Sequence, residues 1–234
     1  MQIYARVQLG QLATLHLLDQ RQYRSPEACG KPPLNGGQRV TDDCTERLDP
    51  ARTMLGAEQE RWLADGLKQQ QGAWTLLAQG TPFGHINEAM VDRAEYWSDA
   101  WTGYPAARQR LMDSLQATRA ANPVIIGGDI HAFVVGGVNA VPERFDTPLA
   151  ASELVTTSIT SDPLALATLD RWRSNSPNLQ RLDGSHRGYL ALTLSKRQLR
   201  TDLVTVDDVT RPDAARGVAA SYVVESGNPA IRLD

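Results

Sequence analysis

The pattern of apolar and polar residues predicts an opening pair of strands followed by helices. Residues 2–8 and 11–18 alternate between apolar and polar side chains and are joined at Gly10, which predicts a β-hairpin. Residues 55–71 instead carry apolar side chains at helical spacing, with acidic residues in the early turns, and predict a helix. A second helix is predicted over residues 104–121. The order of these elements favours an α/β protein.

Short apolar runs predict further strands. Residues 124–126 form a β-branched run without polar alternation, which is typical of a strand covered on both faces in the middle of an α/β sheet. The sequence after residue 207 is polar and contains Pro and Gly, so we expect residues 208–234 to form a weakly packed tail. The remaining predicted elements are strands at residues 74–78, 133–138, 154–159, 189–194, 199–206 and 221–224 and a helix at residues 163–173.

Composition and charge argue against two kinds of partner. The chain has 234 residues, 41% of them hydrophobic, which suits one domain with a sizeable core or a large piece of a bigger domain. The formal net charge is −3 and no basic tract stands out, so nucleic acid is not an expected partner. No apolar run approaches the roughly 18 residues of a membrane span. The opening residues also lack the basic head and apolar stretch of a signal peptide.

Two cysteines, Cys29 and Cys44, lie in a Pro- and Gly-rich stretch over residues 25–50. That stretch predicts a long surface loop, and loops of this length are uncommon unless they are functional or cross-linked. A disulfide would close a loop of about 15 residues and contribute roughly 3 kcal/mol in the chain-entropy model. Two free thiols are the alternative, and the sequence leaves both open.

The tetrad Gly128-Asp129-Ile130-His131 follows directly on the predicted buried strand. An Asp and a His two residues apart in extended chain project to the same side, so the two side chains are predicted to face one site. Ligands of open α/β sheets bind outside the carboxyl ends of the strands. Carboxylate oxygen suits Ca²⁺ and imidazole suits iron or zinc, so the pair indicates metal binding. By itself the pattern equally allows an Asp that caps a turn and a hydrogen-bonded His.

Six motifs in order along the chain resemble the PhoD-like alkaline phosphatase family. They are LDQRQYR at residues 18–24, LGAEQERWL at 55–63, DAWTGYPAAR at 99–108, GDIHA at 128–132, ELVTTSITS at 153–161 and the segment 178–189. The resemblance implies an α/β fold, the C-terminal part of a calcineurin-like (purple acid phosphatase-like) αββα metallophosphatase sandwich, over residues 1–207. One departure is Thr102, where the family has Asp, and this weakens any polar role there.

The resemblance implies a metal-dependent phosphoesterase that acts on phosphate esters with Fe³⁺ and Ca²⁺. It carries metal-ligand roles over to Asp129 and His131. Segments that hold further ligands in the family have no counterpart before Gln2, so we expect a chain truncated at its N-terminus and inactive alone. A catalytically silent scaffold, which depends on a partner or self-associates, is the alternative. Family members are commonly exported, which implies a periplasmic or extracellular location.

Other polar residues are weaker candidates for substrate contacts. Asp19, Arg21 and Arg24 leave the end of a predicted strand together, and guanidinium groups recognise phosphate oxygens; an Asp–Arg ion pair that fixes the next loop is the alternative. His186 could meet a phosphate or belong to an exposed basic turn. Glu153 could support a metal ligand or be the outward residue of a strand. The five tryptophans are interpreted as core or rim packing.

Overall fold

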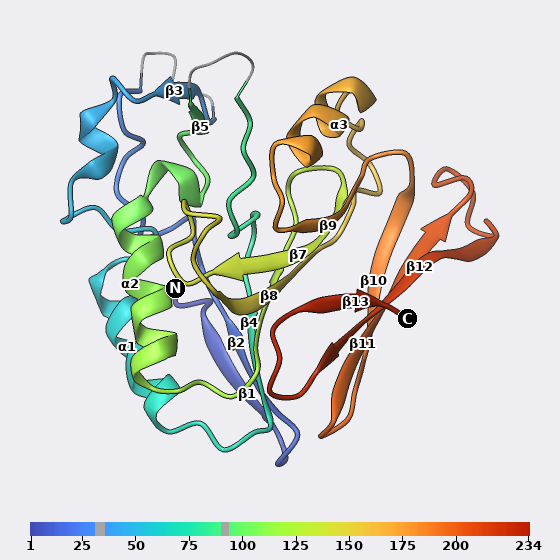
Figure 1. The fold of residues 1–234 in the computed structure, drawn as a ribbon, viewed down its shortest axis with the longest axis horizontal. Helices are drawn as coiled ribbons and strands as arrows, with labels where there is room; N and C mark the ends of the chain where they lie inside the picture. Colours follow the sequence, from blue (N-terminus) through green and yellow to red (C-terminus); the bar gives the residue numbers. More distant parts are fainter. Residues whose placement is uncertain (31–35, 90–93) are drawn as a thin grey trace.

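Two β-sheets pack face to face, with helices covering the outer face of the larger sheet, and a small two-stranded sheet lies beside them (Figure 1). The computed structural model describes residues 1–30, 36–89 and 94–234. The predicted α/β fold class is confirmed. Residues 31–35 of the predicted long loop lie outside the described residues.

The larger sheet has the strand order β1-β2-β4-β6-β8-β7-β9. Strands β2, β4, β6 and β8 run parallel to one another, whereas β1, β7 and β9 pair antiparallel with their neighbours. The predicted buried strand is β6, and it lies in the centre of the sheet, as its apolar run requires. The strand bounds are β1 Ala5–Leu9, β2 Ala13–Leu17, β4 Trp74–Ala78, β6 Pro123–Gly127, β7 Phe133–Asn139, β8 Leu149–Val155 and β9 Leu179–Asp183.

Helices α1 (Ala57–Lys68) and α2 (Pro105–Ala117) pack on one face of this sheet. Leu63 and Leu67 of α1 are four residues apart and therefore lie on one side of the helix, where they join the core formed with α2 and the sheet. Pro105 occupies the first turn of α2, where its missing N–H costs no hydrogen bond. Both predicted helices are confirmed, each a few residues shorter than expected.

The smaller sheet packs on the opposite face of the larger one. Its core residues Leu199, Leu203 and Val224 meet Trp74 and Phe133 of the larger sheet. The strand predicted at residues 221–224 is confirmed and is longer than expected: it covers residues 216–225, hydrogen-bonds along β11 and buries Tyr222 to Val224. The bounds are β10 Arg187–Leu194, β11 Gln198–Val206, β12 Arg216–Glu225 and β13 Ile231–Leu233.

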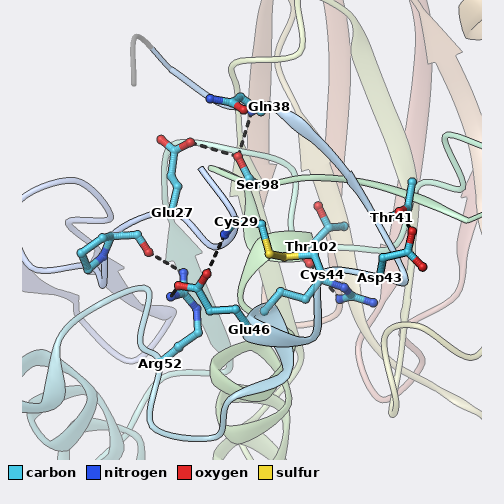
Figure 2. The surroundings of a disulfide bond; sticks show 12 residues. Glu27, Cys29, Gln38, Thr41, Asp43, Cys44, Glu46, Arg52, Ser98 and Thr102 are labelled. Carbon is cyan, nitrogen blue, oxygen red and sulfur yellow. Dashed lines mark hydrogen bonds and ion pairs between the residues drawn. A yellow bond between two sulfur atoms is a disulfide. The ribbon is translucent and has the colours of Figure 1, made fainter. Parts of the chain in front are cut away.

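A disulfide between Cys29 and Cys44 closes the segment that carries β3, so the open question about the two thiols is settled in favour of the bridge. Figure 2 shows that the Cys29 N–H also donates to Glu46, 2.8 Å away. Strand β3 (Arg39–Thr41) pairs antiparallel with β5 (Glu95–Trp97). A short 3-10 helix follows each of these strands in the chain, Thr45–Leu48 after β3 and Trp101–Gly103 after β5.

The segment after β8 differs from its prediction. A strand was expected over residues 154–159, but β8 ends at Val155, and the Thr156 N–H donates to Gly127 as the chain leaves the sheet. The following serines bond within a loop, from the Ser158 hydroxyl to the Ser161 carbonyl, before helix α3 (Leu166–Ser174) begins. In the described part of the chain, no helix is long and apolar enough to span a membrane.

Candidate functional site

Strand β6 ends in a tight turn that carries Asp129 and His131. Both residues have left-handed backbone angles, with φ of 75° at Asp129 and 57° at His131, and the Ile130 N–H donates to the Gly128 carbonyl. The turn can start here because Gly127 has no side chain: a Cβ at that position would lie 2.5 Å from the Thr81 carbonyl oxygen. The assumption of extended chain is therefore wrong, although both side chains still line one cavity.

That cavity has a volume of about 410 Å³ and opens beside the carboxyl ends of the parallel strands. Its walls come from the turn after β6, the segment after β4, the β3–β5 pair and α3. The lining residues with charged or aromatic side chains are Arg39, Glu88, Trp97, Asp129, His131 and Trp172.

The Asp129 carboxylate lies in a charged environment and is 45% exposed. Its Oδ1 atom is 3.8 Å from Nη2 of Arg21. Burial raises the pKa of Asp129 and nearby Asp99 raises it further, whereas Arg21 and His131 oppose the rise. A carboxylate beside a second carboxylate is stabilised by an added cation, so this position suits a metal ion.

The His131 imidazole is held in one orientation. Its Nδ1 atom lies 2.8 Å from the backbone carbonyl of Asp162. Since a carbonyl only accepts, Nδ1 carries the hydrogen, and the Nε2 lone pair is available. Metal-ligating histidines are typically fixed by this kind of bond through their other ring nitrogen.

Arg21 and Arg24 both pair with Asp99, not with Asp19. Arg21 Nη1 is 2.9 Å from Asp99 Oδ2, and its side chain remains 49% exposed. Arg24 is 17% exposed and donates to the Asp99 carbonyl and to Glu27. The Asp–Arg ion pair predicted from sequence is therefore corrected in its partner. Of the two arginines, Arg21 is the one positioned beside Asp129 with solvent access.

Asp19 shapes the turn that follows β2. Its carboxylate accepts hydrogen bonds from the backbone N–H groups of Arg21 and Gln22 and from the Gln22 side chain, and Asp19 is 5% exposed. These bonds use the carboxylate inside its own turn, as Asp side chains commonly do. The geometry supports a structural role for Asp19.

His186 lies in a separate hydrogen-bonded group. Its Nδ1 is 3.0 Å from both Asp183 Oδ2 and the Ser185 hydroxyl, and its carbonyl accepts from Thr157. Burial alone would raise the pKa of Asp183, but hydrogen bonds from Ser185, Arg181 and His186 lower it below its usual range. His186 is outside the set of residues that line the cavity of Asp129 and His131.

Known proteins resemble this chain over nearly its whole length. The family model for the PhoD-like phosphatase matches residues 1–203. The chain belongs to the PhoD-like phosphatase family. It is 32% identical to alkaline phosphatase D of Bacillus subtilis (strain 168) over 235 residues. The matched region covers 99% of this chain and 39% of that protein. A solved structure of PhoD matches with a TM-score of 0.88 and 32% identity, covering 100% of this chain and 44% of that one.

These comparisons confirm the resemblance drawn from the six motifs to the family of PhoD-like phosphatases. The PhoD-like chain spans less than half the length of the relatives that it matches.

The side chains of this PhoD-like chain fit part of a metal site. Asp129 offers carboxylate oxygen and His131 offers Nε2, and both line the same cavity. Among residues 1–30, 36–89 and 94–234, no group of three or more His, Cys, Asp or Glu side chains is arranged to hold an ion. A Ca²⁺ ion takes about 6 to 8 oxygen ligands, so these two donors do not complete a site.

Sequence reasoning missed most of the cavity wall. The sequence predicts only core or rim packing for Trp97 and Trp172 and no site role for Arg39 or Glu88, yet all four residues line the cavity. Arg39 Nη1 lies 3.9 Å from Glu88 and 2.8 Å from Glu95, residues far away in the sequence. No local motif signals these contacts, because the β3–β5 pair and α3 create them. Glu153, read as a possible outward residue, is instead fully buried.

Proposed function

We propose that this chain is the C-terminal portion of a metal-dependent phosphoesterase of the alkaline phosphatase D type. The observation that carries the proposal is the turn after β6, where Asp129 and His131 line one cavity and His131 Nδ1 is fixed by a carbonyl. The half-exposed Arg21 guanidinium, 3.8 Å from Asp129, supplies a group that binds phosphate oxygens.

Asp129 and His131 are proposed as metal ligands, with Fe³⁺ and Ca²⁺ as the ions. Carboxylate oxygen suits the hard Ca²⁺ ion, and imidazole suits iron. The remaining ligands are proposed to lie in a polypeptide segment that this chain does not contain. Two facts support this: the described residues supply only two donors together, and the chain covers 39% of alkaline phosphatase D. The chain alone is therefore expected to be inactive.

A location outside the cytoplasm is part of the proposal. The Cys29–Cys44 bridge supports it, because disulfides persist in oxidising compartments and are rare in the cytosol.

The test is hydrolysis of p-nitrophenyl phosphate with added Ca²⁺ and Fe³⁺. The chain is assayed alone and together with a separately produced polypeptide that covers the N-terminal part of its relatives. We expect turnover only in the mixture, with loss of at least about a hundredfold in the His131→Ala variant. His186→Ala is the matched control and is expected to retain activity. Turnover that survives both Asp129→Ala and His131→Ala refutes the assignment.

A silent, partner-dependent scaffold is the second candidate. Strand β1 forms one edge of the larger sheet. Its residues Val7 and Leu9, and Ile3 just before it, are each more than two-fifths exposed. An apolar sheet edge is a ready surface for pairing with another chain. Absence of turnover under every metal and mixture, combined with a stable complex, favours this candidate.

A further inference from the structure

The cavity next to Asp129 and His131 has largely apolar walls. Trp97 and Trp172 form part of the lining, and Ile86, in the segment after β4, packs in a cluster with Leu169 and Trp172 of α3. Apart from the charged or titratable residues Arg39, Glu88, Asp129 and His131, most lining residues have apolar side chains. They suit an apolar group that is joined to whatever Asp129 and His131 bind.

The wall over residues 82–88 is fixed from two sides. The buried Glu153 carboxylate accepts hydrogen bonds from two consecutive backbone N–H groups of this segment, the second of them from Gly84 at 3.0 Å. At the other end, the Asn87 N–H donates to the Ser176 hydroxyl, just beyond α3, at 2.9 Å. Because both ends are anchored, the cavity is preformed and a ligand need not open it.

Arg39 is engaged by carboxylates at the cavity wall. Its Nη1 atom is 2.8 Å from Glu95 and 3.9 Å from Glu88, and its guanidinium carbon lies 5.9 Å from the centre of the Trp172 ring. The charge of Arg39 is therefore balanced within the wall. Arg21, beside Asp129, remains the arginine with solvent access at the metal-ligand end.

We propose that this cavity receives the organic group of the substrate and selects phosphate esters of aromatic or bulky aliphatic alcohols. The inference rests on the proposed phosphoesterase function, since the phosphate is taken to lie at Asp129 and His131. The volume of about 410 Å³ is within the range of about 300 to 1,000 Å³ found for small-molecule pockets. An apolar group gains from burial against Trp97 and Trp172, whereas a polyhydroxylated group has less apolar surface to bury there.

The test measures binding to the chain by calorimetry, first alone and then with Ca²⁺, Fe³⁺ and the complementary polypeptide, so it does not depend on turnover. Methylphosphonate and 1-naphthylmethylphosphonate share one anionic end and differ in the size of the apolar group. We expect the naphthyl compound to bind at least about tenfold more tightly, because its rings become buried between the indoles. The Ala100→Phe variant, which fills the cavity without removing a core side chain, is expected to abolish this preference.

Leu166→Ala is the matched control, because Leu166 is 56% exposed on α3 and lies outside the lining. It is expected to keep the preference. Equal binding of the two phosphonates, or a preference that survives Ala100→Phe, overturns the inference. A preference that vanishes when the complementary polypeptide is added also overturns it, because another segment then fills the cavity. Hydrolysis of p-nitrophenyl phosphate in the same mixture tests the proposed function separately.

Discussion

Replacing Cys29 and Cys44 by serine should destabilise the protein through one defined segment. The bridge spans a sequence separation of 15, and a loop of that length corresponds to about 3 kcal/mol in the chain-entropy model. For a chain of this size, that loss lowers the melting temperature by roughly 6 to 12 °C. The bridge also holds a small buried cluster in which Ala28 and Val40 contact Tyr96.

The effect should be concentrated near the cavity. Arg39 lies inside the loop that the bridge closes, and β3 is three residues long, so its pairing with β5 gives little independent stability. Hydrogen exchange of the described residues between Cys29 and Thr41 should therefore accelerate more than exchange in β6. Urea unfolding of the wild type with and without reductant, beside the double variant, measures the global loss.

The reasoning fails if the double variant unfolds within about 0.5 kcal/mol of the wild type, since ordinary surface substitutions lie in that range. It also fails if exchange accelerates equally in β6 and β3, because the loss would then be global. Reductant should have no effect on the double variant, which serves as the control.

Two further predictions concern the partly buried carboxyl group of Glu88 and the fully buried one of Glu153. Burial raises the pKa of Glu88 from 4.5 to about 7; Arg39 opposes this rise and Glu95 adds to it. Because the folded protein binds this proton more tightly than the unfolded chain does, the stability that Glu88 contributes is fully present below pH 4.5 and is lost as the pH rises through 7. Glu88→Gln should match the wild type in urea unfolding at pH 4 and exceed it at pH 8, by at most about 3 kcal/mol; equal curves at both pH values contradict this. Glu153→Gln should cost about 1 to 3 kcal/mol, because an amide accepts only one of the two backbone N–H bonds, and unchanged unfolding contradicts it.

The sequence predicted the elements that depend on local pattern. The alternating start and the two amphipathic helices each carry a period that indicates an element type, whereas the β6 run indicates a strand by its unbroken β-branched residues. All four are confirmed. The position of the site is also predicted from local pattern, because a buried strand that ends in Gly and Asp indicates the ligand-binding edge of a sheet. Asp129 and His131 indeed line a cavity at that edge.

The sequence could not predict features that arise from long-range packing. The first residues of β12 are exposed, so the sequence predicts only residues 221–224 of this strand, and its full length depends on its pairing with β11. Glu153 is charged and therefore typical of a surface position, yet it is buried, and its carboxylate accepts hydrogen bonds from two backbone N–H groups of the segment after β4. The predicted extended backbone at Asp129 is wrong for a related reason, because the left-handed angles of the turn depend on tertiary contacts that the local sequence does not show.

The strained turn at the end of β6 provides the last test of the site. His131 has a φ of 57°, a conformation that costs a residue with a Cβ roughly 1 to 2 kcal/mol of conformational free energy and costs glycine little. His131→Gly should therefore be more stable than His131→Ala by about 1 kcal/mol in urea unfolding, and the same order should hold for Asp129. If Ala and Gly variants unfold alike, the left-handed turn is not enforced by its surroundings. If the difference is present, the chain keeps two costly residues where glycine would be easier, which is expected when their side chains serve a site instead of stability.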